Sequence, residues 1–328
     1  MGRLARAAAV AAAAAVLVAA AGAPGGVAAG GVRRHPKQRQ QPKQGGGGES
    51  LVGVFRSVAD ATNCSLLAID PTTGFNTTVA AVDVCVGTSQ TYPAFSSLDP
   101  VSNTIRVAVS TSPAIVAYDV TTGAVAARWP LPEYNGTDAW LGLVTLPAAS
   151  GGVGTTYLVT MYTVLQLAPG GGALTRVAAV NLPASGEVAA APDGRIFVAA
   201  GSAPSLTIIN AAAGFAVTTL TTTVSQVWDL QWSPAANALV VLGSYTLYYL
   251  PVDGTAAGTA TKIWAVPDGP GYPRVNGISP AGDVFYFIDF ASAYTVALPP
   301  SANGTVSVLT HEPFTGAPRA IGYPVWVA

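Results

Sequence analysis

The chain has 328 residues, of which 50% are hydrophobic and 9% are charged, and its formal net charge is −1. This composition excludes an intrinsically disordered protein and a nucleic-acid binder of the usual basic kind. The 36 glycines and 25 prolines, together with abundant valine and threonine, favour an all-β fold of many short strands joined by turns.

The N-terminal segment 1–29 has the layout of a secretory signal peptide. Arg3 and Arg6 form a short positive region, an apolar run follows over residues 7–21, and small residues suited to cleavage come after it. The run is shorter than the roughly 20 residues of a spanning helix. We therefore predict cleavage and secretion, with an uncleaved N-terminal anchor as the alternative. After cleavage we expect no transmembrane segment, because every later apolar run is interrupted.

Residues 30–50 form a basic linker rich in proline, glutamine and glycine, and such a composition excludes a packed core. From residue 51 onward the chain has 8 Lys and Arg against 15 Asp and Glu, a net charge of −7. A basic segment on an acidic body suits either a solvated spacer or contact with an anionic surface. Residues 51–328 are predicted to form the folded domain.

A turn motif recurs through the folded domain, typified by Ser279-Pro280-Ala281-Gly282-Asp283, and an apolar strand follows each copy. The turn prolines are 42 to 47 residues apart: Pro100, Pro147, Pro192, Pro234, Pro280 and Pro324. A second, glycine-containing turn follows in each repeat, at Gly74, Gly123, Gly172, Gly214, Gly258 and Gly304. A period of this length with all-strand content predicts a β-propeller with one four-stranded blade per repeat.

The two ends of the domain are incomplete repeats. Residues 318–324 resemble an innermost strand with no blade after it, and the segment from Ser50 onward resembles three strands with no innermost strand before them. If these segments pair, they complete one blade and remove exposed sheet edges. This predicts six blades closed by the N- and C-terminal strands. Seven blades is the alternative, if the N-terminal blade is complete by itself.

Cys64 and Cys85 flank the first glycine-containing turn at equal distances from its centre. Residues equidistant from the turn of an antiparallel hairpin face each other, and secretion permits disulfides. We therefore predict a Cys64–Cys85 disulfide, with two free buried thiols as the alternative. Four glycosylation sequons also suit a secreted protein with exposed turns, at Asn63, Asn76, Asn135 and Asn303.

The innermost strands of a propeller line its central channel, where ligands usually bind. Five residues before the turn prolines lie Phe95, Gly142, Glu187, Asp229, Val275 and Arg319. Equivalent positions should have equivalent heights, so Glu187 and Asp229 are predicted to point into the channel from neighbouring blades. Asn276, beside Val275, and Arg319 are expected within reach of the same space. Hard oxygen ligands converging on an axis suit Ca²⁺, whereas Arg319 between the carboxylates would make a structural salt bridge.

The segment Asn276–Asp289 resembles six-bladed calcium-dependent lactonases and related senescence-marker-type proteins. It has an Asn-Gly that opens a strand, a Ser-Pro turn, and an apolar strand that ends in Asp. It departs from the family pattern because two residues are missing before Ser279, and Ala281 replaces an Asp. The resemblance covers about 15 residues and implies a metal-dependent hydrolase with its site at the central channel.

Other catalytic patterns are absent from the sequence. The chain has two histidines, His35 in the linker and His311, which we expect in a late loop between blades. It has no Gly-x-Ser-x-Gly elbow, His-Glu-x-x-His motif or P-loop. The first functional hypothesis is therefore a secreted, monomeric, non-catalytic binding or scaffold module for a protein or glycan. The alternative is the calcium-dependent hydrolase.

Overall fold

The structure is a computed structural model of the chain. The residues that it describes are 50–56, 64–70, 76–82, 95–99, 101–109, 113–131, 138–146, 154–169, 172–183, 186–243, 245–253, 258–266, 275–288, 292–313, 319–320 and 325–327. The predicted signal peptide and nearly all of the predicted linker lie outside them, so both stay predictions.

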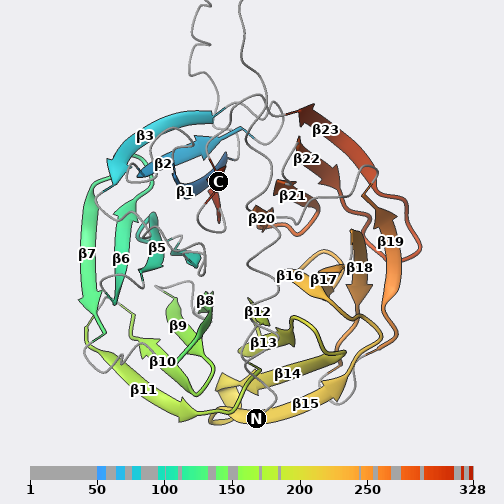
Figure 1. Cartoon of the computed structure of the whole chain (residues 1–328), viewed down its shortest axis with the longest axis horizontal. Helices are drawn as coiled ribbons and strands as arrows, with labels where there is room; N and C mark the ends of the chain where they lie inside the picture. Colours follow the sequence, from blue (N-terminus) through green and yellow to red (C-terminus); the bar gives the residue numbers. More distant parts are fainter. Residues whose placement is uncertain are drawn as a thin grey trace, which may run out of the picture. The chain divides into compact units, whose positions relative to one another are not determined.

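The described residues form six antiparallel sheets arranged as the blades of a ring (Figure 1). The protein is a six-bladed β-propeller. Among these residues the helical content is one 3₁₀ turn, Ala211–Ala213. Blade 2 contains β4 (Ser96–Asp99), β5 (Thr104–Val109), β6 (Ala114–Asp119) and β7 (Val125–Pro130). Blade 3 contains β8 (Trp140–Leu146), β9 (Thr155–Thr160), β10 (Thr163–Leu167) and β11 (Leu174–Ala179).

The remaining complete blades follow in chain order. Blade 4 contains β12 (Gly186–Ala190), β13 (Arg195–Ala200), β14 (Ser205–Asn210) and β15 (Ala216–Thr221). Blade 5 contains β16 (Val227–Ser233), β17 (Ala238–Gly243), β18 (Thr246–Leu250) and β19 (Thr261–Ala265). Blade 6 contains β20 (Val275–Ile278), β21 (Val284–Ile288), β22 (Ser292–Ala297) and β23 (Ser307–Pro313). In each of these five blades the first strand in the chain lies nearest the ring centre (Figure 1).

Blade 1 joins the two ends of the domain and closes the ring. Its members are β1 (Ser50–Arg56), β2 (Cys64–Ile69), β3 (Asn76–Val82), β24 (Arg319–Ala320) and β25 (Val325–Val327). Phe55 pairs with Ala320 and Leu51 pairs with Trp326, both in antiparallel register. The predicted closure and the count of six blades are therefore confirmed. Strands β24 and β25 both pair with β1, so the C-terminal segment forms the innermost edge of this blade.

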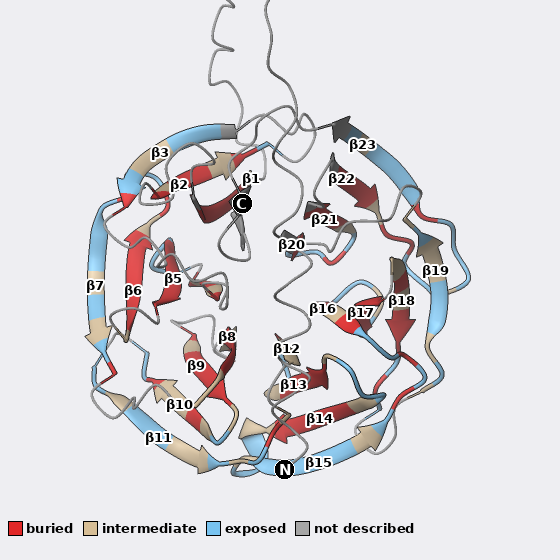
Figure 2. Cartoon of the chain, viewed as in Figure 1, coloured by how far each residue is buried: buried red, intermediate tan, exposed pale blue. Residues whose placement is uncertain are grey.

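The hydrophobic core lies between neighbouring blades rather than at one centre. The second strands, such as β5 and β17, are buried along their whole length. Outermost strands such as β15 are almost entirely exposed (Figure 2). Each apolar cluster combines residues of two adjacent blades, as where Tyr286 of blade 6 packs with Leu51 and Phe55 of blade 1. Sheets that pack face to face in this way favour large apolar residues, including β-branched and aromatic ones, on both faces.

The recurring turn holds its shape through residues in the left-handed backbone region. Gly194 and Gly282 have φ of 94° and 77°, and Asn103 and Asn237 have φ of 52° and 47°. Glycine and asparagine tolerate this region best, which explains why the repeat places one of them after each of these turn prolines. A Cβ at Gly282 would lie 2.6 Å from Cδ of Pro234, so turns of adjacent blades also pack closely.

The hairpin of β2 and β3 has a different register from the one predicted. Ile69 pairs with Asn76 next to the turn, and a β-bulge lies between Leu66 and Leu67. The residue opposite Cys64 is therefore Val82, and the prediction that Cys85 directly faces Cys64 across the ladder is wrong. The Cys64 side chain is buried between blades 1 and 2. Cys85 lies outside the described residues, so the disulfide itself stays a prediction.

Intact-mass measurement tests the disulfide. Without reductant, we expect no cysteine of the secreted protein to react with an alkylating agent, because both thiols would be oxidised. Loss of the bridge in Cys85→Ser should lower the free energy of unfolding by about 3 kcal/mol, the loop-entropy estimate for a loop of about 20 residues. Two alkylated cysteines in unreduced, unfolded protein would show that no bridge forms.

Candidate functional site

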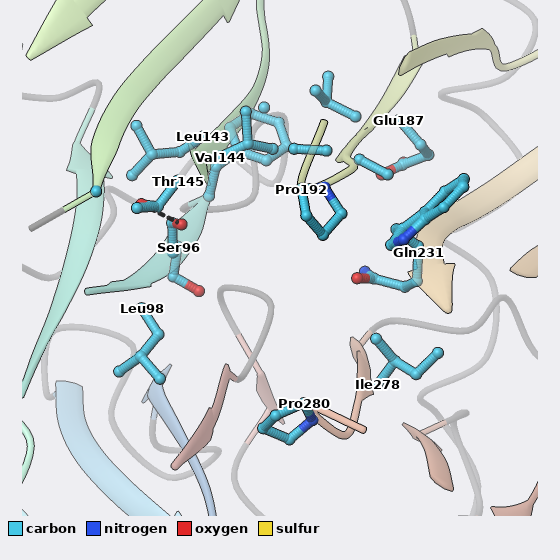
Figure 3. A pocket seen from close by; sticks show the side chains of 18 of the residues that line it. Ser96, Leu98, Leu143, Val144, Thr145, Glu187, Pro192, Gln231, Ile278 and Pro280 are labelled. Carbon is cyan, nitrogen blue, oxygen red and sulfur yellow. Dashed lines mark hydrogen bonds between the residues drawn. The ribbon is translucent and has the colours of Figure 1, made fainter. Parts of the chain in front are cut away.

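A cavity of about 570 Å³ lies inside the ring of blades. Its walls come chiefly from the innermost strands of blades 2 to 6, and Figure 3 shows Leu98, Glu187, Gln231 and Ile278 around it. Most residues that line it are apolar. The polar ones are Ser96, Ser97, Thr145, Glu187, Asp229, Gln231 and Ser279. A concave, mostly apolar space with a few convergent polar groups is the usual form of a small-ligand site.

The repeat register identifies residues in this wall. Phe95, Gly142, Glu187 and Asp229 share a position relative to the turn prolines, and all four line the cavity. Gly142 has no room for a side chain, because its Cβ would lie 2.5 Å from Cβ of Val188 in the next blade. Phe95 packs into the apolar cluster between blades 2 and 3. Of these four positions, only those in blades 4 and 5 present a carboxylate.

Asp229 is a buried carboxylate, and one of its two oxygens has no hydrogen-bond donor among the described residues. Asp229 is only 1% exposed, and its Oδ1 accepts a hydrogen bond of 3.1 Å from Nε2 of Gln231. Oδ2 is also buried and accepts no hydrogen bond from any described residue. Burial raises the pKa of Asp229 from 3.8 to about 7, although hydrogen bonds from Gln231 and the Leu230 backbone oppose that rise. A group with this environment is a candidate for ligand or proton binding.

The alternation of side chains along β16 gives the direction of Asp229. Ser233 Oγ donates a 2.7 Å hydrogen bond to the carbonyl of Gly282 in blade 6. Asp229 is four residues earlier in a regular stretch of the strand, so it lies on the same face, toward blade 6. Trp232, on the opposite face, stacks on Phe197 of blade 4. The β-bulge that β16 contains precedes Asp229 and leaves this facing unchanged.

The other predicted channel residues are only partly described. Glu187 is half-buried and lies on the face of β12 whose apolar members pack toward blade 5. Asn276 belongs to β20 and Arg319 to β24, but their side chains lie outside the described part, so their reach into the channel stays a prediction. Among the described side chains, no three acidic, histidine or cysteine groups lie close enough together to hold a metal ion.

A buried ion pair that the repeat pattern did not indicate lies beside the cavity. Arg106 on β5 donates from Nη2 to Oδ2 of Asp99 over 2.5 Å, and from Nη1 to Thr156 of blade 3. Thr156 and Thr145 share a 2.8 Å hydrogen bond, and Ser97 donates to Thr145 over 2.7 Å. The network therefore ties blade 2 to blade 3 and ends in the cavity wall. The sequence feature that could have indicated this ion pair is Arg106 itself, a single charged residue in a mostly apolar strand.

Aromatic residues at the connections between blades serve packing where they are described. Trp140 is buried in the cluster between blades 2 and 3, and Trp129 packs on that cluster. The expected loop position of His311 is wrong, because this residue lies within outermost strand β23. Its ring stacks on Tyr294 at 4.3 Å. The antiparallel ladder between β22 and β23 continues through His311 to Pro313, so His311 lies on the outermost strand of blade 6 and not in the channel region.

One predicted glycosylation site has a described environment. Asn303 lies in an exposed turn after β22, as an acceptor asparagine requires. Asn76 begins β3, whereas Asn63 and Asn135 lie outside the described residues, so modification at all four stays a prediction. No helix within the described ranges has the length and apolar character needed to cross a membrane.

Comparison with known proteins identifies the fold. No known protein family and no curated protein matches the chain. A chain from a nidogen/laminin complex aligns over 86% of this chain and 99% of its own, with 10% identity and a TM-score of 0.60. A functionally unknown protein from Desulfotomaculum acetoxidans aligns over 82% of this chain and 83% of its own, with 13% identity and a TM-score of 0.52.

A third similar structure is that of an enzyme. Virginiamycin B lyase from Staphylococcus aureus aligns over 81% of this chain and 85% of its own, with 11% identity and a TM-score of 0.50. These identities are too low to transfer an activity, and a propeller hosts many unrelated functions. The comparisons therefore identify the fold of this chain and leave its function to the geometry of the site.

Proposed function

We propose that this protein is a secreted, non-catalytic binding module whose protein or glycan ligand occupies the central channel. The observation that carries the proposal is the channel cavity, which combines a large apolar wall with a few polar groups from several blades. Such an arrangement buries apolar ligand surface while the polar groups orient the ligand. The signal-peptide pattern and the sequons support an extracellular role. A propeller of the same fold in a nidogen/laminin complex provides a precedent for protein association.

Blocking the channel tests this proposal. The purified protein would be screened against glycan and extracellular-protein arrays, and each ligand found would be titrated against Leu98→Trp and Ile278→Trp, which narrow the cavity from different strands. We expect at least a tenfold loss of affinity in both variants. Thr219→Trp, on the exposed face of β15, adds the same bulk outside the ring and should bind normally. Unchanged affinity in both channel variants would contradict the proposal, as would chemical turnover of the ligand.

The second candidate function is a calcium-dependent hydrolase. It is favoured by one observation, since Glu187 and Asp229 line the same cavity and Oδ2 of Asp229 accepts no hydrogen bond from any described residue. Ca²⁺ requires six to eight oxygen ligands, and the third predicted ligand, Asn276, has no described side chain. Calorimetric titration of Ca²⁺ into the parent, Glu187→Gln and Asp229→Asn distinguishes the candidates. A heat that only the parent gives supports the hydrolase, and equal heats in all three exclude this metal site.

A further inference from the structure

The outer edges of the six blades differ in their regularity. Each blade ends in an outermost strand with no further strand beside it: β3, β7, β11, β15, β19 and β23. In five of these strands a β-bulge interrupts the ladder, and the extra residue always belongs to the outermost strand: Val79, Ala126, Val177, Ile263 and Leu309. The ladder of β15 with β14 keeps a regular register along its whole length. Bulges twist an edge and so discourage it from pairing with another chain, and β15 lacks this protection.

Charged residues protect most of the other edges as well. They are Arg128 in β7, Arg176 in β11, Lys262 in β19 and Glu312 in β23. Strand β3 has no charged residue, but it begins with the predicted glycosylation site Asn76. Strand β15 reads Ala-Val-Thr-Thr-Leu-Thr, without a charge, a proline or a sequon. Charge and proline on an edge strand discourage pairing, so β15 is the least protected of the described outermost strands.

The hydrogen bonds beside β15 give the direction of its backbone groups. The N–H of Thr222, directly after the strand, donates to the carbonyl of Pro204 over 2.9 Å, toward β14. Backbone groups alternate in direction along a regular antiparallel strand. The N–H and C=O groups that point away from β14 therefore belong to Val217, Thr219 and Thr221, which are all exposed (Figure 2). A regular, uncharged strand with outward donors and acceptors is a template for a further strand.

We propose that this protein forms a two-fold symmetric dimer, in which β15 pairs antiparallel with β15 of a second copy. In an antiparallel ladder, outward residues of one strand must lie opposite outward residues of the other. All three outward residues pair when the symmetry axis passes at Thr219, which then lies opposite its own copy, while Val217 lies opposite Thr221. Cross-strand pairs of threonine and other β-branched residues stabilise a sheet. Blade 4 of the two rings would form one continuous sheet.

The absence of charge favours a second copy as the occupant of this edge. In a symmetric interface each side chain near the axis lies close to its own counterpart, so a charged residue there would repel itself. Arg128, Arg176 and Lys262 would have this effect on their strands, whereas β15 would bring threonines together. A dimer would replace the monomer expected from the sequence. It is independent of the proposed channel ligand, because β15 lies on the outer rim of the ring (Figure 1).

Analytical ultracentrifugation of the purified protein tests the dimer. From about 1 µM to about 1 mM, the affinity range of weak complexes, we expect the mean mass to rise from that of one chain toward that of two. Thr219→Lys and Thr219→Glu should each weaken self-association by about tenfold or more, because like charges would lie directly opposite each other. An equimolar mixture of these two variants should restore the dimer, because a lysine would then lie opposite a glutamate.

Thr175→Lys provides the matched control. It adds the same charge to an exposed position of β11, an outermost strand that has a bulge, so it should self-associate as the parent does. Circular dichroism would verify that each variant is folded. A parent protein that stays monomeric at every concentration would overturn the dimer, and so would a mixture of Thr219→Lys and Thr219→Glu that associates no better than either alone. If the monomeric parent binds an array protein that Thr219→Lys does not, the edge accepts a partner's strand and the dimer is wrong.

Discussion

Replacing Asp99 with asparagine should lower the free energy of unfolding by about 3–5 kcal/mol, because it leaves a buried guanidinium without its counter-charge. The side chains of Arg106 and Asp99 are only 4% and 0% exposed. Burial lowers the pKa of Arg106, and the charge of Asp99 opposes that effect. The side-chain oxygen of asparagine can still accept the hydrogen bond that the Val101 N–H donates to Oδ1 of Asp99. The substitution therefore removes the charge while keeping the turn, and denaturant unfolding at pH 7 measures the loss.

An exposed ion pair in blade 4 provides the matched control. Asp193 accepts from Nε of Arg195 over 2.7 Å, but its own side chain is 51% exposed. Asp193→Asn should therefore change the free energy of unfolding by less than about 1 kcal/mol. The double variant Asp99→Asn/Arg106→Met should recover much of the lost stability, because it leaves no buried charge. A loss below about 1 kcal/mol for Asp99→Asn, or no recovery in the double variant, would contradict this account of the network.

The fold was predictable because one turn recurs at a nearly constant spacing. The proline marks the end of an innermost strand, and the residue in the left-handed region, such as Gly194 or Asn237, returns the chain. The spacing of the turns predicted the number of blades, and the two incomplete end repeats predicted that β1 and β24 pair to close the ring. The same register placed Glu187 and Asp229 in the wall of one cavity. Each of these inferences used turn residues that recur at the same position of every repeat.

Features that depend on contacts between repeats were not predictable in this way. The partner of Arg106 in blade 3, Thr156, lies 50 residues away, and nothing in the repeat period singles it out. The β-bulge between Leu66 and Leu67 shifted the register of one hairpin, which a symmetric reading of the turn could not include. Likewise, sequence register placed Asp229 at the channel but gave no sign that Gln231 would satisfy one of its oxygens and leave the other.

Asp229→Asn should make the protein more stable near neutral pH, by an amount that grows as the pH rises. Burial raises the pKa of Asp229 to about 7 in the folded protein, against an ordinary value of 3.8. Between these two values the folded state binds more protons than the unfolded state, so the parent loses stability with increasing pH. The protonated carboxyl is stabilising relative to the ionised one, and this contribution is complete below about pH 4 and lost by about pH 7. Asparagine does not titrate and avoids the loss.

The size of the effect follows from the two pKa values. About three pH units at about 1.4 kcal/mol per unit give an upper limit of about 4 kcal/mol. Denaturant unfolding of the parent and Asp229→Asn at several pH values from 4 to 8 measures it. The difference between the two proteins should be smallest at pH 4, widen through pH 5 and 6, and level off above about pH 7. Asp119→Asn is the control, because hydrogen bonds from Thr122 lower the pKa of that exposed carboxyl, which gives its titration the opposite sign.

The same experiment reports whether Asp229 Oδ2 has a partner in solution. A cation beside the carboxylate, whether Arg319 or a bound ligand, would favour its ionised form and move its pKa back toward the ordinary value. A stability difference that stays constant from pH 5 to 8 would therefore contradict a carboxylate without a donor. Repeating the series in Arg319→Gln distinguishes the two partners, since the pH dependence would emerge in that variant only if Arg319 had suppressed it.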